Sequence, residues 1–281
     1  MRVVILSIIS LGFILVSCKK PSTFTQISIL PQYAVIENIE DVHAIVDSCI
    51  TPYIYTKVIS LRGLPVDEKK VKFVEMLLPS ILVSQQYLYQ EITRVEHIEN
   101  WILTHPKMMK MDSLFLYKLF ETYNCNEIPE LKIRLKPHPA SIVLGQAALE
   151  SGWGSSRFFK EGNNVFGIWS YDAGEDRIQA LTGRDSTSIY VRSYPSIEES
   201  VNDYFETIAR VNAYEEFRQK RYVSEKPFEL IPLLNKYSEI GDVYTDKLKQ
   251  LIESNDLTKY DSYVIRKNYF VEEVIELSQS I

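Results

Sequence analysis

Residues 145–154, GQAALESGWG, carry the chain from a helix into a glycine-rich loop. The helix is predicted to start near Ala140, because Pro139 suits a first turn, and to end at about Glu150. Its apolar side chains bury one side, and its small residues let other backbone or a ligand come close. Gly152 is the expected C-terminal cap. The stretch therefore predicts a buried helix whose last turn presents a carboxylate.

Glu150 stands where a carboxyl group tends to keep its proton. It faces the negative end of the helix dipole, which disfavours the ionised form. Packing of Trp153 on the carboxyl group would remove water from it and act in the same direction. Both effects raise the pKa, as a general acid at neutral pH requires. The alternative is a solvated helix-end glutamate, which position alone favours and the surrounding motif disfavours.

A second motif, GNNVFGIW, follows at residues 162–169. Asn163 and Asn164 supply amide donors and acceptors, and Phe166 and Trp169 supply flat aromatic faces. This mixture suits sugar rings that bear N-acetyl groups. Together the two motifs indicate a carbohydrate site around Glu150.

These motifs resemble the signature of the bacterial glucosaminidase family (glycoside hydrolase family 73), and in particular of its Bax-like members. Residues 72–82, KFVEMLLPSIL, resemble the upstream helix of that family. Residues 190–204 resemble its strand-to-helix joint, and residues 212–218, NAYEEFR, its tyrosine motif. The match covers roughly residues 66–255 in the family's order, which makes chance convergence negligible.

The resemblance implies a mainly α-helical, lysozyme-like domain with a small β-hairpin beside an active cleft, preceded by N-terminal helices. The catalytic glutamate of the family falls on Glu150, and its cleft tyrosine falls on Tyr214. A core aromatic at a helix end is the alternative for Tyr214. The residues expected to contact the sugar are Gln146, Ser151, Trp153, Asn163, Asn164, Phe166, Gly167, Trp169 and Tyr194.

Many members of the family carry a second carboxylate on the hairpin. Asp185, 35 residues after Glu150, has the best spacing here and lies near the predicted turn. Asp176 and Glu175 are the other candidates. A solvated turn carboxylate is at least as good an interpretation of each one.

The implied reaction is that of an endo-β-N-acetylglucosaminidase, in which Glu150 protonates the bridging oxygen of a β-1,4 link in peptidoglycan. A hairpin carboxylate could then activate water, or the 2-acetamido oxygen of the substrate could trap the cation. Cleavage after N-acetylmuramic acid with closure of an anhydro ring would instead make a lytic transglycosylase-type muramidase. The weak case for Asp185 favours substrate assistance. A non-catalytic peptidoglycan-binding lipoprotein is the alternative from another class.

The first residues predict export and lipid anchoring. The apolar run 3–16 would make about 21 Å of helix, shorter than a bilayer core of roughly 30 Å, so residues 1–17 read as a signal peptide. The run ends in LVSC, which resembles a bacterial lipobox and implies acyl chains on Cys18, unless that cysteine is a coincidence. Lys19 favours the outer membrane over the inner one. Residues 18–32 read as a lipid anchor and tether.

Residues 33–136 are predicted to form an N-terminal helical region. It includes a possible helix near 39–50, an extended run over 53–61 and a long helix from Asp67. Pro79 is expected to kink that helix or split it.

Residues 137–255 are predicted to form the glucosaminidase domain. Its hairpin would pair 177–181 with 188–193, and the capping box at 196–199 would start the next helix. Residues 256–281 form a C-terminal extension without an assigned role. Further helices are expected over residues 112–123, 140–150, 227–237 and 242–254.

Composition restricts the partners of the protein. A net charge of −6, without a run of basic residues, argues against nucleic acid. The four histidines lack the spacing of metal ligands, so neither a metal peptidase nor any cofactor is expected. Cys49 and Cys125 could pair or stay as free thiols. A membrane-attached monomer is expected.

Overall fold

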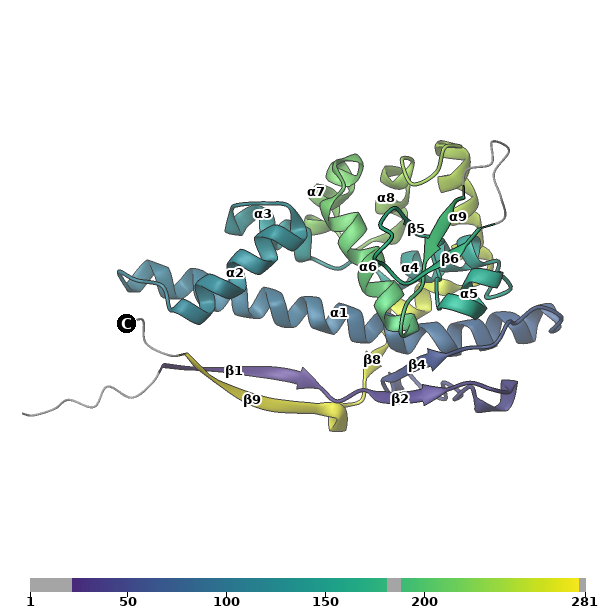
Figure 1. Cartoon of the computed structure of the whole chain (residues 1–281), viewed down its shortest axis with the longest axis horizontal. Helices are drawn as coiled ribbons and strands as arrows, with labels where there is room; N and C mark the ends of the chain where they lie inside the picture. The colour runs from purple at the N-terminus through teal and green to yellow at the C-terminus, as the bar shows by residue number, and fades with distance from the viewer. Residues whose placement is uncertain (1–21, 181–187, 278–281) are drawn as a thin grey trace, which may run out of the picture.

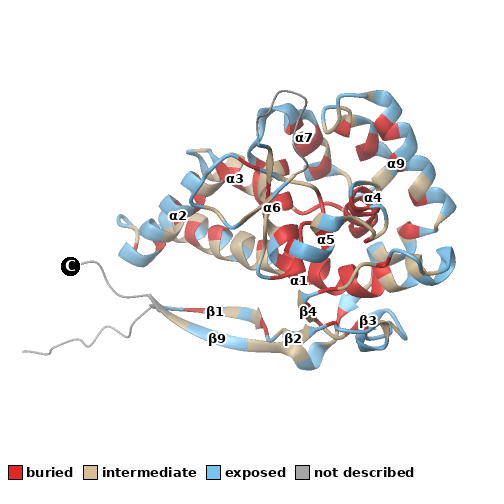
Figure 2. Cartoon of the chain, turned by 45° about the vertical axis from the view of Figure 1, so that its right-hand side comes forward, coloured by how far each residue is buried: buried red, intermediate tan, exposed pale blue. Residues whose placement is uncertain are grey.

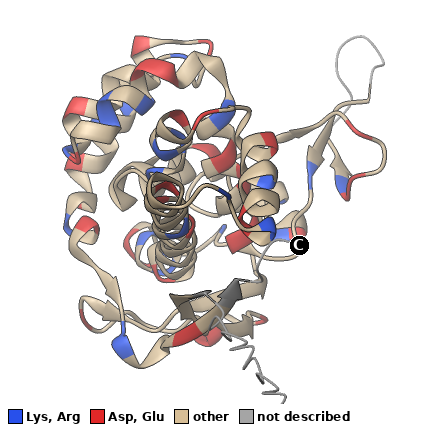
Figure 3. Ribbon diagram, turned by 90° about the vertical axis from the view of Figure 1, so that its left-hand side faces the viewer, with Lys and Arg blue, Asp and Glu red and all other residues tan. Residues whose placement is uncertain are grey.

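The computed structural model describes residues 22–180 and 188–277 (Figure 1). The predicted signal peptide, Cys18 and Asp185 lie outside these residues. Helices make up most of the described chain, which confirms the mainly α-helical class. In the view of Figure 3, acidic and basic residues are interspersed along the helices.

Helix α1, Val66–Thr104, is the longest element, and its 39 residues extend over roughly 60 Å. Residues 73–84 are buried without exception, so other parts of the chain enclose this segment. Pro79 lies inside it and does not divide the helix, which corrects the predicted split. We attribute the continuity to this packing, which offsets the backbone hydrogen bond that proline cannot make.

The other helices lie on one side of α1, and strands β1, β2 and β9 lie on the opposite side (Figure 1). Short 3₁₀ turns, η2 at Asn212–Tyr214 and η4 at Leu257–Ser262, join or extend the helical layer. The remaining α-helices are α2 (Lys110–Tyr123), α3 (Ile128–Leu135), α4 (Ala140–Ser151), α5 (Arg157–Gly162), α6 (Ile197–Arg210), α7 (Glu215–Val223), α8 (Pro227–Leu230) and α9 (Asp242–Ser254).

Helix α4 lies at the centre of this layer. Residues 140–148 are all buried, as the red ribbon of Figure 2 shows. Gly145 lets α9 approach closely, since a Cβ at this position would stand 2.8 Å from side-chain atoms of Ile252 and Leu248. Burial along its first nine residues leaves only the last turn of α4 near the surface.

A small sheet of three antiparallel strands follows α5. It has the order β5-β7-β6, with β5 at Trp169–Ser170, β6 at Arg177–Gln179 and β7 at Tyr190–Arg192. The pairing of β6 with β7 confirms the predicted hairpin, with shorter strands. Strand β5, which the sequence analysis did not predict, extends it to a sheet.

The N-terminal segment contains strands where a tether and helices were expected. Strand β1, Ser22–Ile29, pairs along its length with β9, Phe270–Leu277, so this part of the predicted tether is folded. Strand β2, Gln32–Val35, pairs in parallel with β4, Tyr53–Lys57. The Ser- and Thr-rich sequence of β1 resembles a linker, and its partner strand lies about 245 residues away in the chain. Local sequence therefore does not reveal the pairing.

The helix predicted over residues 39–50 is reduced to one 3₁₀ turn, η1, at Ile39–Asp41. The Asp41 carboxylate accepts the backbone N–H groups of Glu37 and Asn38, which closes the turn locally. Strand β3, Cys49–Ile50, then pairs with β8, Val264–Ile265. Cys49 and Cys125 are both free thiols.

The C-terminal segment returns to the body of the molecule. The Asp261 carboxylate in η4 accepts the backbone N–H and the hydroxyl of Ser141 at the start of α4 (2.7 and 2.8 Å). The turn η5, Lys267–Tyr269, then leads into β9. The first turn of α4 is thus held by residues beyond α9.

Within the described ranges, none of the helices is both long enough and apolar enough to span a bilayer.

Candidate active site

Helix α4 ends in a tight turn directly after Glu150. Gly152 adopts the left-handed conformation (φ 59°), which confirms the predicted C-terminal cap. The Ser151 hydroxyl donates to the Ala147 carbonyl (2.6 Å) and accepts the Gly154 N–H (2.9 Å). Ser151 is 1% exposed, so it stabilises this turn, which corrects the expectation that it contacts a sugar.

Glu150 is exposed at the end of α4, and one neighbour holds its carboxylate. The Tyr244 hydroxyl of α9 donates to Glu150 Oε1 at 3.1 Å. Protein atoms around the carboxylate displace part of its water and raise the pKa of Glu150, and the hydrogen bond from Tyr244 opposes this rise. The carboxyl group thus combines access from solvent with an increased affinity for a proton.

A chain of buried hydrogen bonds leads into this carboxylate. Gln146, one turn before Glu150 and fully buried, donates from Nε2 to the Tyr244 hydroxyl oxygen (3.1 Å). The Tyr204 hydroxyl of α6 donates to Gln146 Oε1 (2.6 Å). Gln146 therefore orients Tyr244, which corrects the expectation that its amide binds a sugar. Full burial forces this outcome, because a buried amide needs partners inside the protein.

The same chain continues to a buried cation. His138 Nε2 lies 2.7 Å from the Tyr204 hydroxyl, and Arg221 Nη1 lies 3.3 Å from His138 Nδ1. Arg221 can only donate, so Nδ1 accepts and Nε2 carries the proton. Burial and the charge of Arg221 lower the pKa of His138, which agrees with a neutral ring. We call these six residues, from Arg221 to Glu150, the Glu150 network.

All donors of the Glu150 network point the same way, from Arg221 toward the carboxylate. Aligned hydrogen bonds polarise one another, so the last donor, the Tyr244 hydroxyl, is strengthened. The network can therefore fix the rotamer of Glu150 and set how readily its carboxyl group ionises.

Two further tyrosines surround this end of the network. The Tyr237 ring stacks on Tyr244 with centroids 5.4 Å apart, and Tyr214 lies 6.3 Å from Tyr237. Burial raises the pKa of Tyr214, and the charge of Glu150 adds to this rise, which places the two groups within electrostatic reach. Tyr214 thus lies next to Tyr237 near this end of the network, and its role beside Glu150 stays a prediction.

The paired asparagines hold the loop after α5. Asn163 Nδ2 donates to the carbonyls of Thr56 and Tyr194 (3.0 and 2.9 Å). The Asn164 amide both donates to and accepts from the Ile168 backbone (3.0 and 3.1 Å). Both residues are buried, so these side-chain donors tie the loop together, which corrects their expected role as ligands of an N-acetyl group.

Phe166, Trp153 and Gly167, which were expected to contact the sugar, have structural surroundings of different kinds. Phe166 is 4% exposed and stacks on Tyr204 with centroids 4.2 Å apart. The half-buried Trp153 ring packs edge-on against Phe73 in α1 at 5.5 Å. Gly167 supplies a backbone conformation with φ 67°. The inward packing of Phe166 corrects its expected stacking on a sugar, since its face is already covered.

Two exposed aromatic rings lie at strand β5 of the small sheet. Trp169 is 53% exposed, and Tyr171 beside it is 86% exposed, with centroids 6.3 Å apart. Tyr194 is half-buried, and its hydroxyl donates to Asp203 Oδ2 (2.5 Å). Trp169 in β5 and Tyr171 just after it thus have ring faces that a sugar could stack on.

The candidates for a second carboxylate differ in their surroundings. Both carboxylate oxygens of Glu175 accept from Arg192 (3.2 and 2.8 Å), which commits this side chain to an ion pair. Asp176 is exposed. Asp185 lies outside the described residues, so its position relative to Glu150 is left as a prediction.

The sequence analysis did not assign site roles to Tyr204, His138, Arg221 or Tyr171. Tyr244 matches a later tyrosine of the family less tightly, and a purely structural role was the alternative for it. The Pro137-His138-Pro139 run was one available signal, since a histidine fixed between prolines directly before α4 has a restricted backbone. Tyr204 carried no comparable local signal, because its hydrogen-bond partners His138 and Gln146 lie elsewhere in the chain.

Comparisons with known proteins concern the same part of the chain. Residues 130–257 match the family model described as "Glucosaminidase: Mannosyl-glycoprotein endo-beta-N-acetylglucosaminidase". The chain is similar to Protein bax of Escherichia coli (strain K12), 30% identical over 151 residues that cover 50% of this chain and 52% of that protein. It is also similar to the exo-glucosaminidase LytG of Bacillus subtilis (strain 168), 27% identical over 128 residues, 43% of this chain and 45% of that protein. The chain thus spans about half the length of the curated relatives it matches.

Solved structures give two further similarities. The catalytic domain of the autolysin Auto from Listeria monocytogenes aligns with a TM-score of 0.38 and 22% identity, covering 59% of this chain and 96% of that one. The glycoside hydrolase domain of FlgJ from Salmonella typhimurium aligns with a TM-score of 0.36 and 20% identity, covering 51% of this chain and 89% of that one.

Proposed function

Because residues 130–257 of this chain belong to the glucosaminidase family, we propose that the protein is a peptidoglycan hydrolase that cuts glycan strands. In this proposal it acts as an endo-β-N-acetylglucosaminidase with Glu150 as general acid. The setting of Glu150 carries the proposal: its carboxyl group is accessible at the end of α4, partial burial raises its pKa, and the Tyr244 hydroxyl holds it in place. A general acid needs both properties to protonate a polymer at neutral pH.

Each residue of the site has a role in the proposed reaction. Glu150 protonates the bridging oxygen as the sugar moves toward an oxocarbenium ion. Tyr214 lies within electrostatic reach of Glu150 and helps to position the reacting sugar. Trp169 and Tyr171 present exposed rings on which neighbouring sugars stack. The other members of the Glu150 network keep the acid oriented.

The step after protonation has two forms within this proposal. In substrate assistance, the 2-acetamido oxygen traps the cation and the anomeric configuration is retained. With Asp185 as a base, water attacks from the opposite face and the configuration is inverted. We favour substrate assistance, because the described carboxylate Glu175 is committed to Arg192. The anomeric form of the first product distinguishes the two.

Activity on purified peptidoglycan tests the proposal. A zymogram with the full chain should show a cleared band, and an exposed Glu150 favours cuts within strands, so strand length should fall early in the digestion. Binding to peptidoglycan without clearing would contradict the enzyme and support a wall-binding lipoprotein. Release of single sugars from strand ends would contradict the endo mode.

We predict that Tyr244→Phe moves the alkaline limb of the pH profile of kcat/KM to higher pH. The Tyr244 hydroxyl stabilises ionised Glu150, so its removal raises the pKa of the acid and keeps it protonated to higher pH. The maximal rate should fall roughly tenfold, because the carboxyl group loses its fixed orientation. Tyr222→Phe, on an exposed side chain, is the control. If the alkaline limb of the pH profile stays in place, Tyr244 does not influence the ionisation of Glu150.

The proposed anchor at Cys18 yields a separate prediction. Replacement by serine in Cys18→Ser removes the thiol that would carry the acyl chains, and two or more chains are what make such anchoring stable. The wild-type protein should sediment with membranes, most of it with the outer membrane, and the variant should be recovered in the soluble fraction. Equal membrane recovery of both proteins would contradict lipidation.

A further inference from the structure

The turn between α1 and α2 exposes apolar side chains at one end of the molecule (Figure 1). We call residues 102–111, ILTHPKMMKM, the α1–α2 tip. Ile102, Leu103 and Met111 are 39%, 77% and 48% exposed, and Leu114, one turn further along α2, is 55% exposed. Large apolar side chains exposed so close together indicate a surface that meets an apolar partner.

The tip carries only positive charge. Lys107 and Lys110 are exposed, and the tip contains no aspartate or glutamate, although the whole chain has a net charge of −6. The next acidic residues on either side, Glu99 and Asp112, are already in ion pairs, at 2.6 and 3.2 Å. Apolar side chains beside lysines suit the surface of an anionic bilayer, which offers acyl chains to the former and phosphates to the latter.

The first residues of β1 pack against this turn. Phe24 and Met109 form a buried cluster, and Trp101 packs against it. The Trp101 indole N–H donates to the Lys107 carbonyl (3.2 Å), which closes the turn. The start of β1 therefore lies beside the tip, at the same end of α1 (Figure 1).

This position puts the tip close to the proposed lipid anchor. Ser22, the first residue of β1, is four positions after Cys18, a span of at most about 14 Å. Acyl chains on Cys18 in a bilayer would hold the tip within a short distance of the lipid. The anchor thus raises the effective concentration of lipid at the tip, so even a small surface can bind.

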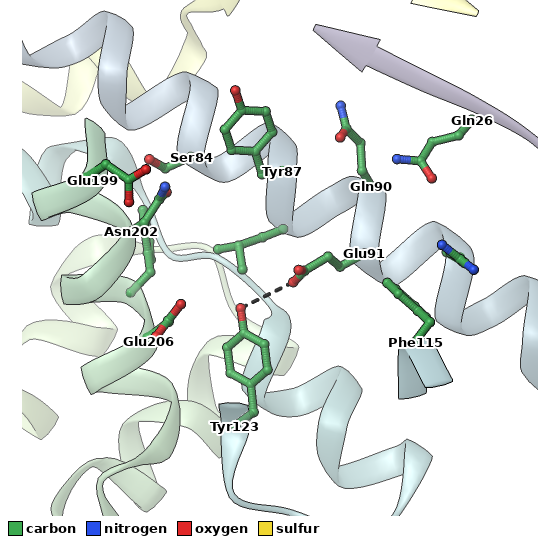
Figure 4. A pocket seen from close by; sticks show the side chains of 13 residues that line it. Gln26, Ser84, Tyr87, Gln90, Glu91, Phe115, Tyr123, Glu199, Asn202 and Glu206 are labelled. Carbon is green, nitrogen blue, oxygen red and sulfur yellow. Dashed lines mark hydrogen bonds between the residues drawn. The ribbon is translucent and has the colours of Figure 1, made fainter. Parts of the chain in front are cut away.

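The tip keeps a fixed shape because α2 is tied to α1 behind it. The Tyr123 hydroxyl donates to Glu91 Oε2 (3.2 Å), which Figure 4 shows as a dashed line. Arg94 pairs with Asp112, and its guanidinium carbon lies 4.1 Å from the centre of the Phe115 ring. A preorganised surface loses less entropy on binding than a loop that must first become ordered.

We propose that the α1–α2 tip docks on an anionic phospholipid bilayer. Its apolar side chains enter the layer below the headgroups, and Lys107 and Lys110 contact lipid phosphates. This docking rests on the proposed anchor at Cys18 and does not depend on hydrolysis.

The ribbon of β1 and β9 is the competing apolar surface, and its charge is wrong for this partner. Ile27 and Val274 are 52% and 64% exposed. Glu272 pairs with Ile27 in the strand register and is also exposed, and Glu273 is exposed next to it. These carboxylates repel anionic lipid, so charge complementarity selects the tip.

Docking at the tip leaves the candidate active site uncovered. Phe73 of α1 packs against Trp153, three residues after Glu150. Phe73 and Leu103 are 30 positions apart on the same helix, which corresponds to about 45 Å. The bilayer contact and the Glu150 turn therefore lie near opposite ends of α1.

Quenching of tryptophan fluorescence by brominated lipid tests the proposal. Full-chain Leu103→Trp is reconstituted in vesicles of phosphatidylglycerol and brominated phosphatidylcholine, with the wild type as background. Bromine quenches only at close range, so the added tryptophan should lose most of its emission. Val46→Trp is the matched control, because Val46 is 81% exposed in a loop whose Val42 carbonyl accepts from Lys72, near the other end of α1. Its emission should persist.

A charge reversal separates docking from mere nearness to the anchor. Lys107→Glu together with Lys110→Glu, added to Leu103→Trp, should restore most of the emission, because the new carboxylates repel phosphatidylglycerol. Both lysines are exposed, so the fold should tolerate the change. The protein should still sediment with the vesicles.

Quenching at position 103 no stronger than at position 46, or quenching that survives the charge reversal, would overturn the proposal. A blue-shifted but unquenched emission at position 103 would also overturn it and assign the tip to a protein partner. Cys18→Ser reports on the anchor separately, and equal membrane recovery there would remove the premise of docking. An inactive protein that is quenched at position 103 would reject the hydrolase and keep this surface.

Discussion

Glu150→Gln is expected to lower the rate of peptidoglycan hydrolysis by roughly 10²–10⁴-fold while the protein stays folded. Glutamine keeps the size of the side chain and can still accept the Tyr244 hydrogen bond (3.1 Å in the wild type), but it has no proton to give to the leaving oxygen. The loss should appear in kcat more than in KM, because the substrate contacts remain. Dye release from labelled peptidoglycan measures the rate.

Two controls make that result specific. Circular dichroism and thermal melting should be close to wild type, since Glu150 is exposed. Glu253→Gln, an exposed glutamate on α9, should keep full activity. Near-normal hydrolysis by Glu150→Gln would show that another group donates the proton.

Arg221→Met is expected to destabilise the fold by about 3 kcal/mol. The Arg221 guanidinium is 2% exposed and donates to the carbonyls of Ile133 and Arg134 (3.2 and 2.8 Å) and to His138 Nδ1 (3.3 Å). Methionine fills similar space and leaves these three acceptors, two of them in buried hydrogen bonds, without the Arg221 donors. A loss of this size corresponds to a melting temperature lower by roughly 6–12 °C.

Thermal melting of Arg221→Met beside Arg157→Met measures this effect. Arg157 also forms an ion pair, with Glu161 at 3.0 Å, but both side chains are more than two-fifths exposed. An exposed pair of this kind contributes little, so its loss should change stability by less than about 1 kcal/mol. Equal melting temperatures for the two variants would contradict the role assigned to Arg221.

The helices next to the site could be predicted because their signals are local. Helix α4 was expected to end near residue 150 and ends at 151, since Gly152 must adopt a conformation that glycine accepts readily. Helix α6 begins after Ser196, whose side chain accepts the Glu199 N–H as in a capping box. These caps depend on neighbours within four residues and not on the rest of the fold.

The N-terminal strands could not be predicted because their partners are distant in sequence. Ser22 pairs with Leu277, and no local periodicity encodes that contact. The helix predicted over 39–50 is absent for a related reason. The apolar spacing there fits a helix, but Cys49–Ile50 instead form a strand that pairs with β8. Tertiary partners thus override local preference here.

The chemistry of the site was only partly accessible from the sequence. The motif identified Glu150, but residue types alone gave the amides of Asn163 and Asn164 to a ligand. In the structure these amides are buried and bond to backbone groups. Packing of the helices places the Tyr244 hydroxyl on Glu150, although the two residues are 94 positions apart in the chain. Which polar groups face inward is a property of packing and cannot be seen in a motif.

Mass spectrometry of the glycan ends made by the purified protein tests the central claim most directly. Cleavage after N-acetylglucosamine leaves reducing N-acetylglucosamine ends, and these are predicted to form with the wild type and to be lost in Glu150→Gln. Anhydromuramic ends would contradict the account and identify the protein as a lytic transglycosylase-type muramidase.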